Sequence, residues 1–229
     1  MFEGIKGFRE ASLLDWDGKV SAVLFVGSCN FRCPFCHNFP LVVGEVDDYN
    51  SEVIKSFLEK NRDFLDGVVL TGGEPTLHPH MRDICAYLRG LGLNIKLDTN
   101  GSTEFDFGMV DYVAMDVKSS LENYEKACGV GVDLKIIREN IAKIMREVDD
   151  YEFRTTVVPG IVDVDEIESI ALSIEGAKKF VIQQFRNEHV LDERFGGVEP
   201  YSSEKLLKMK EIAEEHVDRV VIRGLRDVS

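Results

Sequence analysis

Three neighbouring segments decide the fold: Ser21–Gly27 (SAVLFVG), Ser51–Phe64 (SEVIKSFLEKNRDF) and Gly67–Leu70 (GVVL). The first and last segments are short, apolar and rich in β-branched residues, which is typical of strands buried in a parallel sheet. The middle segment carries its apolar residues on one helical face and starts at a serine that can cap it. Together they predict a strand–helix–strand unit with parallel strands.

The same alternation continues along the rest of the chain. Further strands are predicted at Leu93–Leu97, Tyr112–Met115, Phe153–Val158, Phe180–Phe185 and Val217–Ile222. Further helices are predicted at His78–Gly90, Val132–Val148, Asp165–Ser173 and Ser203–His216. Repeated strand–helix units with right-handed crossovers predict an α/β fold, a partial (β/α)6 TIM-like barrel, in a single domain spanning residues 1–229.

Composition and charge exclude several classes of function. The formal net charge of −14 argues against a nucleic-acid partner, because phosphate contacts need a basic surface. Residues 1–6 lack the basic and apolar regions of a signal peptide, and no apolar run approaches the ~18 residues of a membrane span. We therefore expect no membrane association and a cytoplasmic location.

Three of the five cysteines, Cys29, Cys33 and Cys36, fall in one short segment after the first predicted strand. Clustered thiols in a reducing compartment bind metal more often than they form disulfides. An iron–sulfur cluster fits three thiolates, whereas a structural zinc site would need a fourth ligand, for which His37 is a candidate. Cys85 and Cys128 stand alone, and we expect them to be small packed residues.

Polar motifs follow the other predicted strands, and the carboxyl ends of parallel strands are where such folds place their active sites. The motifs are Thr71–Pro75 (TGGEP), Asp98–Gly101 (DTNG), Asp116–Lys118 (DVK), Arg154–Gly160 (RTTVVPG) and Gln183–Arg186 (QQFR). Each also has a purely structural interpretation, as a turn, a strand-end cap or an internal ion pair. The barrel prediction brings all of them to the mouth that holds the cysteine segment.

With Phe35 just before its last cysteine, the CxxxCxxC segment resembles the signature of the radical S-adenosylmethionine superfamily. The resemblance implies a barrel of the type found in that superfamily and a 4Fe–4S cluster held by Cys29, Cys33 and Cys36. It also implies that S-adenosylmethionine binds the open iron and is cleaved to a 5′-deoxyadenosyl radical.

The resemblance extends to the other motifs and implies the cofactor-binding residues. Gly72, Gly73 and Glu74 match the element that binds the methionine amino group. Asp98, Thr99, Asn100 and Asp116 match elements near the methionine carboxylate, which some members bind through a monovalent cation. Lys118 is expected to offset their charge, and Arg154 to face the ribose or the carboxylate. The segment Gln183–Arg186 is expected to line the adenine or substrate side.

The opening segment Gly7–Lys19, with Cys36-His37-Asn38, resembles glycyl-radical-enzyme activases, especially the activating proteins of anaerobic ribonucleoside-triphosphate reductase and the activases similar to that of pyruvate formate-lyase. This implies an oxidoreductase that installs a glycyl radical on a partner and receives electrons from a flavodoxin or ferredoxin. A radical enzyme acting on a small molecule, similar to 7-carboxy-7-deazaguanine synthase, is the first alternative. A non-catalytic zinc or iron–sulfur module is the second.

Overall fold

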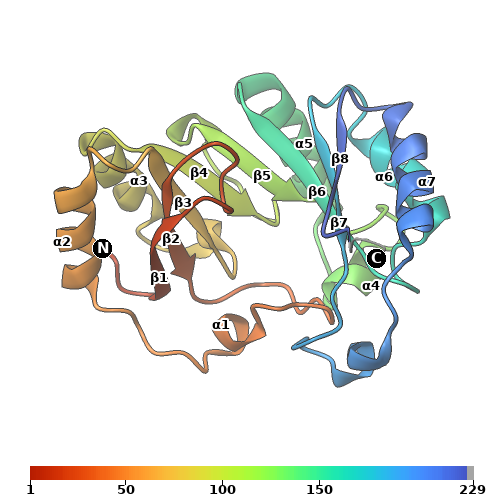
Figure 1. The fold of residues 1–229 in the computed structure, drawn as a ribbon, viewed down its shortest axis with the longest axis horizontal. Helices are drawn as coiled ribbons and strands as arrows, with labels where there is room; N and C mark the ends of the chain where they lie inside the picture. Colours follow the sequence, from red (N-terminus) through yellow and green to blue (C-terminus); the bar gives the residue numbers. More distant parts are fainter. Residues whose placement is uncertain (226–229) are drawn as a thin grey trace.

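The computed structural model describes residues 1–225, which form a curved eight-stranded sheet with helices on its outer face (Figure 1). The strands lie in chain order from β1 to β8; β1 is antiparallel to β2, and all later neighbours are parallel. The strands are β1 (Ile5–Ser12), β2 (Ser21–Val26), β3 (Gly67–Gly72), β4 (Asn94–Thr99), β5 (Tyr112–Asp116), β6 (Tyr151–Val157), β7 (Phe180–Gln184) and β8 (Val220–Arg223). This arrangement confirms the predicted parallel α/β architecture.

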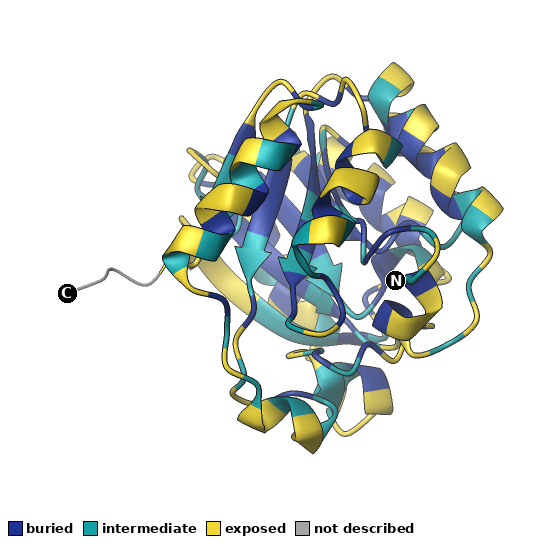
Figure 2. Ribbon diagram, turned by 90° about the vertical axis from the view of Figure 1, so that its right-hand side faces the viewer, coloured by how far each residue is buried: buried dark blue, intermediate teal, exposed yellow. Residues whose placement is uncertain are grey.

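The long helices α2 (Ser51–Asn61), α3 (Met81–Gly90), α5 (Leu134–Glu147), α6 (Val164–Ser173) and α7 (Ser203–Glu214) cover the convex face of the sheet. The short helices α1 (Phe39–Val43) and α4 (Tyr124–Cys128) and the 3-10 turns η1 (Pro75–Leu77), η2 (Phe107–Met109) and η3 (Glu193–Gly197) lie in the connecting segments. Figure 2 shows that each long helix turns its buried residues toward the sheet and its exposed residues outward. None of the helices within residues 1–225 is both long and apolar enough to cross a membrane.

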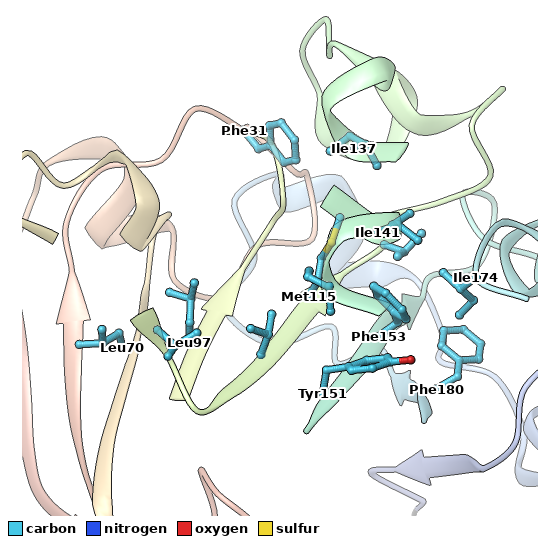
Figure 3. Packing of buried hydrophobic residues seen from close by; sticks show 14 of the residues in the cluster. Phe31, Leu70, Leu97, Met115, Ile137, Ile141, Tyr151, Phe153, Ile174 and Phe180 are labelled. Carbon is cyan, nitrogen blue, oxygen red and sulfur yellow. The ribbon is translucent and has the colours of Figure 1, made fainter. Parts of the chain in front are cut away.

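Alternation along the strands divides the core into two parts. In β2, Ala22 and Leu24 belong to the large cluster between sheet and helices, whereas Val23 belongs to a small cluster on the inner face. Figure 3 shows the large cluster where Phe153 and Phe180 lie beside Ile174 of the layer outside the sheet. The helices thus stabilise the outer face, and the inner face combines this small apolar cluster with polar and charged side chains.

The structure differs from the predicted elements at three places. Strand β1 was not predicted, because its sequence IKGFREAS lacks an apolar run; it forms by pairing with β2 at the edge of the sheet. The helix predicted from His78 begins only at Met81, since Pro79 disfavours a helical conformation at the residue before it. The short helices α1 and α4 lie in segments for which no helix or strand was predicted.

The turn between β1 and β2 crosses the inner face at the end opposite the cysteine segment. Trp16 packs against Tyr112, with ring centroids 6.0 Å apart. Lys96 Nζ donates a hydrogen bond to the Asp15 carbonyl oxygen, and Asp17 forms ion pairs with Lys179 and Arg223. These contacts join the two ends of the curved sheet and close the barrel interior on this side.

Glu152 is the buried anion in this network, and we expect Glu152→Ala to destabilise the fold. Its side chain is 1% exposed and forms ion pairs of 2.7 Å with Lys179 and Arg223. Removing Glu152 leaves two half-buried cations with only the exposed Asp17 as an ion-pair partner, which costs about 3 kcal/mol in the free energy of unfolding. The matched control is Glu139→Ala on the exposed face of α5, where an ion pair with Lys135 contributes at most about 0.5 kcal/mol.

The same residue predicts a pH dependence. Burial opposes ionisation of Glu152, but hydrogen bonds from Arg223 and Lys179 lower its pKa from 4.5 to about 2. A lowered folded-state pKa gives stabilisation that is complete above pH 4.5 and is lost as the pH falls toward 2. Denaturant titrations at pH 7 and pH 3 should therefore show a smaller difference between wild type and Glu152→Ala at pH 3. An equal difference at both pH values would contradict this assignment.

Candidate active site

A cavity of about 270 Å³ opens at the carboxyl ends of the parallel strands. Residues in the carboxyl-terminal halves of β2 to β7, or just after these strands, contribute to its wall, as expected for the mouth of a barrel. Eleven of the twelve predicted site residues line it: Cys29, Cys33, Cys36, Gly72, Gly73, Asp98, Thr99, Asn100, Asp116, Lys118 and Arg154. The structure therefore gathers motifs that lie up to 125 residues apart in the sequence around one space.

The cysteine segment leaves β2 through Ser28, whose φ of 67° turns the chain sharply. A hydrogen bond from the Cys36 backbone N–H to the Cys33 carbonyl closes a tight turn between the last two cysteines. Within residues 1–225, no three His, Cys, Asp or Glu side chains lie close enough together to hold a single metal ion. The thiols thus surround a common cavity without the spacing of a mononuclear zinc site.

The thiols have different electrostatic environments. A hydrogen bond with Cys128 lowers the pKa of Cys33 to about 7, against the effect of burial. Burial raises the pKa of Cys29 to about 11 and also raises the pKa of Cys36. The Lys118 ammonium opposes the rise for both residues. Lys118 is therefore placed to favour negative charge at all three sulfurs.

Cys128 was predicted to be a packed residue, and it is fully buried at the end of α4. Its neighbourhood was not foreseen. It hydrogen-bonds Cys33 through its thiol, and its carbonyl accepts a hydrogen bond of 2.8 Å from the Arg32 N–H. No spacing pattern in the sequence links residue 128 to the cysteine segment, because α4 reaches it only through the tertiary fold.

The two glycines after β3 are required by close packing. A Cβ atom at Gly73 would lie 1.8 Å from the Ser28 carbonyl oxygen, and one at Gly72, whose φ is +119°, would lie 2.5 Å from the Val26 carbonyl oxygen. Only glycine fits at these distances. The backbone of this segment consequently borders the cavity directly beside the cysteine segment.

Glu74 does not line the cavity, in contrast to the expectation that its carboxylate faces an ammonium group. Its side chain is fully buried and accepts hydrogen bonds from the hydroxyl groups of Thr76 and Thr99 and from the backbone N–H of Asn100. The carboxylate therefore joins the TGGEP segment to the DTNG segment. Its role in the structure is to position these two segments.

Two carboxylates in the cavity are paired with cations of the chain. Arg154 lies 2.7 Å from Asp116 and 3.3 Å from Asp98, and Lys118 lies 2.8 Å from the other oxygen of Asp116. Burial opposes the ionisation of Asp116, but Arg154 and Lys118 lower its pKa to about 2. One oxygen of Asp98 is buried without a hydrogen bond and lies 3.5 Å from Lys96. The Lys96 ammonium therefore compensates the charge of this buried oxygen.

A second cavity, of about 710 Å³, adjoins the first and shares His37, Asn38, Thr156 and Gln183 with it. Gln184 and Arg186 also line it. Three residues of the QQFR segment therefore border this cavity, and their place beside the adenine or the substrate stays a prediction.

The model of the family described as the radical SAM superfamily matches residues 23–174, which include the cysteine segment and the TGGEP, DTNG and DVK motifs. The chain belongs to the radical SAM superfamily. Membership implies a 4Fe–4S cluster and S-adenosylmethionine as cofactors.

Within the radical SAM superfamily, two relatives are informative. A Methanocaldococcus jannaschii protein, provisionally named a glycyl-radical enzyme activating enzyme, is 32% identical over 232 residues, covering 96% of each chain. The 7-carboxy-7-deazaguanine synthase of Halobacterium salinarum is 29% identical over 173 residues, covering 70% of this chain and 65% of the relative.

A solved structure shows the same fold. A domain of the pyruvate-formate lyase-activating enzyme from Bacteroides vulgatus superposes with a TM-score of 0.54 at 18% identity, covering 69% of this chain and 99% of that domain.

Proposed function

We propose that this radical SAM enzyme installs a glycyl radical on a partner protein, such as an anaerobic ribonucleotide reductase. The observation that carries the proposal is the similarity to a provisionally named activase over 96% of both chains. The geometry agrees with it, since a large open cavity adjoins the proposed cofactor cavity and offers room for a peptide segment. Positioning of such a segment is the main demand on the protein.

The residues around the cavity fit the implied cofactors. Three thiols on a short loop, with Lys118 near them, match the donor set of a cluster that keeps one iron open. When bound, the cluster supplies one electron that cleaves S-adenosylmethionine to methionine and a 5′-deoxyadenosyl radical, which then takes a hydrogen atom from the substrate.

The chain's own side chains are assigned to hold and orient the cofactor. The backbone at Gly72 and Gly73 borders the place of the methionine amino group, and Arg154 faces its carboxylate or the ribose. Asp98 and Asp116 are already paired with Arg154 and Lys118. A monovalent cation beside Asp98 and Asp116 is part of the same proposal.

The test is electron paramagnetic resonance on anaerobically reconstituted, reduced protein mixed with S-adenosylmethionine and a candidate glycyl-radical enzyme. We expect a glycyl radical signal on the partner and one 5′-deoxyadenosine per radical. Cleavage of S-adenosylmethionine without a radical on any such partner would contradict the activase assignment while leaving the radical chemistry in place.

The second candidate is a small-molecule enzyme similar to 7-carboxy-7-deazaguanine synthase. It is favoured by the identity of 29% over 70% of this chain. Formation of 7-carboxy-7-deazaguanine by the reconstituted protein would select this function over the activase.

A further inference from the structure

The segment that carries the three cysteines has a second face, which the proposed chemistry does not use. Phe31, Cys33 and Phe35 line the cofactor cavity, whereas Arg32 and Pro34 line a separate groove of about 350 Å³. Residues 31–35 therefore separate the cofactor cavity from the groove as a single layer of backbone. A molecule seated in the groove would be separated from Cys33 only by the residues next to it in the chain.

The groove is held rigidly against the cysteine segment. The Arg32 N–H donates to the Cys128 carbonyl at 2.8 Å, and the Asp192 N–H donates to the Pro34 carbonyl at 2.9 Å. A Cβ atom at Gly129 would lie 2.3 Å from the Arg32 carbonyl oxygen, so α4 packs directly on the segment. The outer face is thus a fixed surface built from α4, η3 and the loop after β6.

The groove is basic although the chain carries a net charge of −14. Its charged lining consists of Arg32, Lys126, Arg194 and one carboxylate, Asp192, which is bonded to Arg194. Within residues 1–225, neither Arg32 nor Lys126 forms an ion pair, and both are exposed; the Arg32 guanidinium donates hydrogen bonds to the carbonyl oxygens of Cys29 and Phe31, which fix it on the groove side of the segment. Ile161 and Phe195 add apolar surface. Because Arg32 and Lys126 carry positive charge without an ion-pair partner, on a protein that is otherwise acidic, the groove favours binding of an acidic partner.

We propose that this groove is the docking surface for an acidic one-electron carrier protein that reduces the cluster. The proposal rests on the cluster assignment under the proposed function. The position of the groove allows the carrier to dock without entering the cofactor cavity, so S-adenosylmethionine and the carrier can bind at the same time.

The experiment measures the rate at which photoreduced flavodoxin bleaches the cluster of the reconstituted enzyme in stopped flow. In the double variant Arg32→Glu/Lys126→Glu, we expect the second-order rate constant at low salt to fall by about tenfold. The difference should shrink as salt screens the charges. The matched control is Lys55→Glu/Lys60→Glu on the exposed face of α2, at the opposite end of the sheet from α4 (Figure 1), which carries the same charge change.

Three outcomes separate the possibilities. A loss of rate confined to the groove variant, with reduction by dithionite unchanged in all proteins, supports the docking surface. An equal loss in both double variants, or no loss in either, overturns it. Failure of dithionite to reduce the wild-type protein, or reduction without cleavage of S-adenosylmethionine, overturns the proposed function itself.

Discussion

Cys33→Ala is expected to abolish binding of the iron–sulfur cluster. Cys33 is buried in the middle of the cysteine segment and lines the cavity together with Cys29 and Cys36. A four-iron cluster that already has one iron without a protein ligand is not retained by two thiolates. After anaerobic reconstitution, iron and acid-labile sulfide should fall from about four per chain to a small residual amount, and the absorbance of the cluster should be lost.

The other two cysteines provide the controls for this experiment. Cys85 lies fully buried in α3 and does not line the cavity, so Cys85→Ala should retain the full iron content. Cys128→Ala should also retain the cluster, because Cys128 contacts Cys33 without lining the cavity. Loss of iron in either control variant would show that the ligand set has been assigned incorrectly.

Glu74→Ala is expected to have the second largest effect, through the positions of two binding segments. The alanine would leave the backbone N–H groups of Thr76 and Asn100 and the Thr99 hydroxyl group without their acceptor inside the protein. Unsatisfied buried donors of this kind cost about 3 kcal/mol in the free energy of unfolding. Displacement of the TGGEP and DTNG segments should also weaken binding of S-adenosylmethionine by about tenfold or more, while the cluster is retained.

Calorimetric titration of the reconstituted protein with S-adenosylmethionine, together with denaturant unfolding, measures both effects. Glu104→Ala is the matched control, since Glu104 is an exposed carboxylate shortly after the DTNG segment and should change stability by less than about 0.5 kcal/mol. Unchanged affinity in Glu74→Ala would mean that the two segments keep their positions without the buried carboxylate.

Much of the fold could be predicted because its signals are local. The strands β2 to β7 are short apolar runs, and each is followed by a motif that the parallel topology brings to the same edge of the sheet. Strand β1 could not be predicted in this way. Its residues alternate weakly, and hydrogen bonds to β2 stabilise it at the sheet edge.

In the candidate site, too, some features could be predicted from local sequence and others could not. The three cysteines and the glycines could be identified from spacing, because a tight loop and a close backbone approach need those residue types. The direction of the Glu74 side chain could not be identified. A carboxylate after two glycines is equally suited to binding a ligand and to accepting hydrogen bonds from buried donors. The donors here are Thr76, Thr99 and Asn100, and the positions of the last two depend on the neighbouring strand.

The sequence by itself determined the parallel α/β class and the family and predicted the three cysteine ligands, because these depend on periodicity and on residue types at short range. Only the tertiary structure decided that the buried Glu74 carboxylate joins the TGGEP and DTNG segments and that Cys128 contacts Cys33. It also decided that Arg32 and Lys126 line one groove. The physical reason is that each of these contacts joins residues from different strand–helix units. Their distance is set by how the sheet curves and how α4 packs, and no local pattern encodes it.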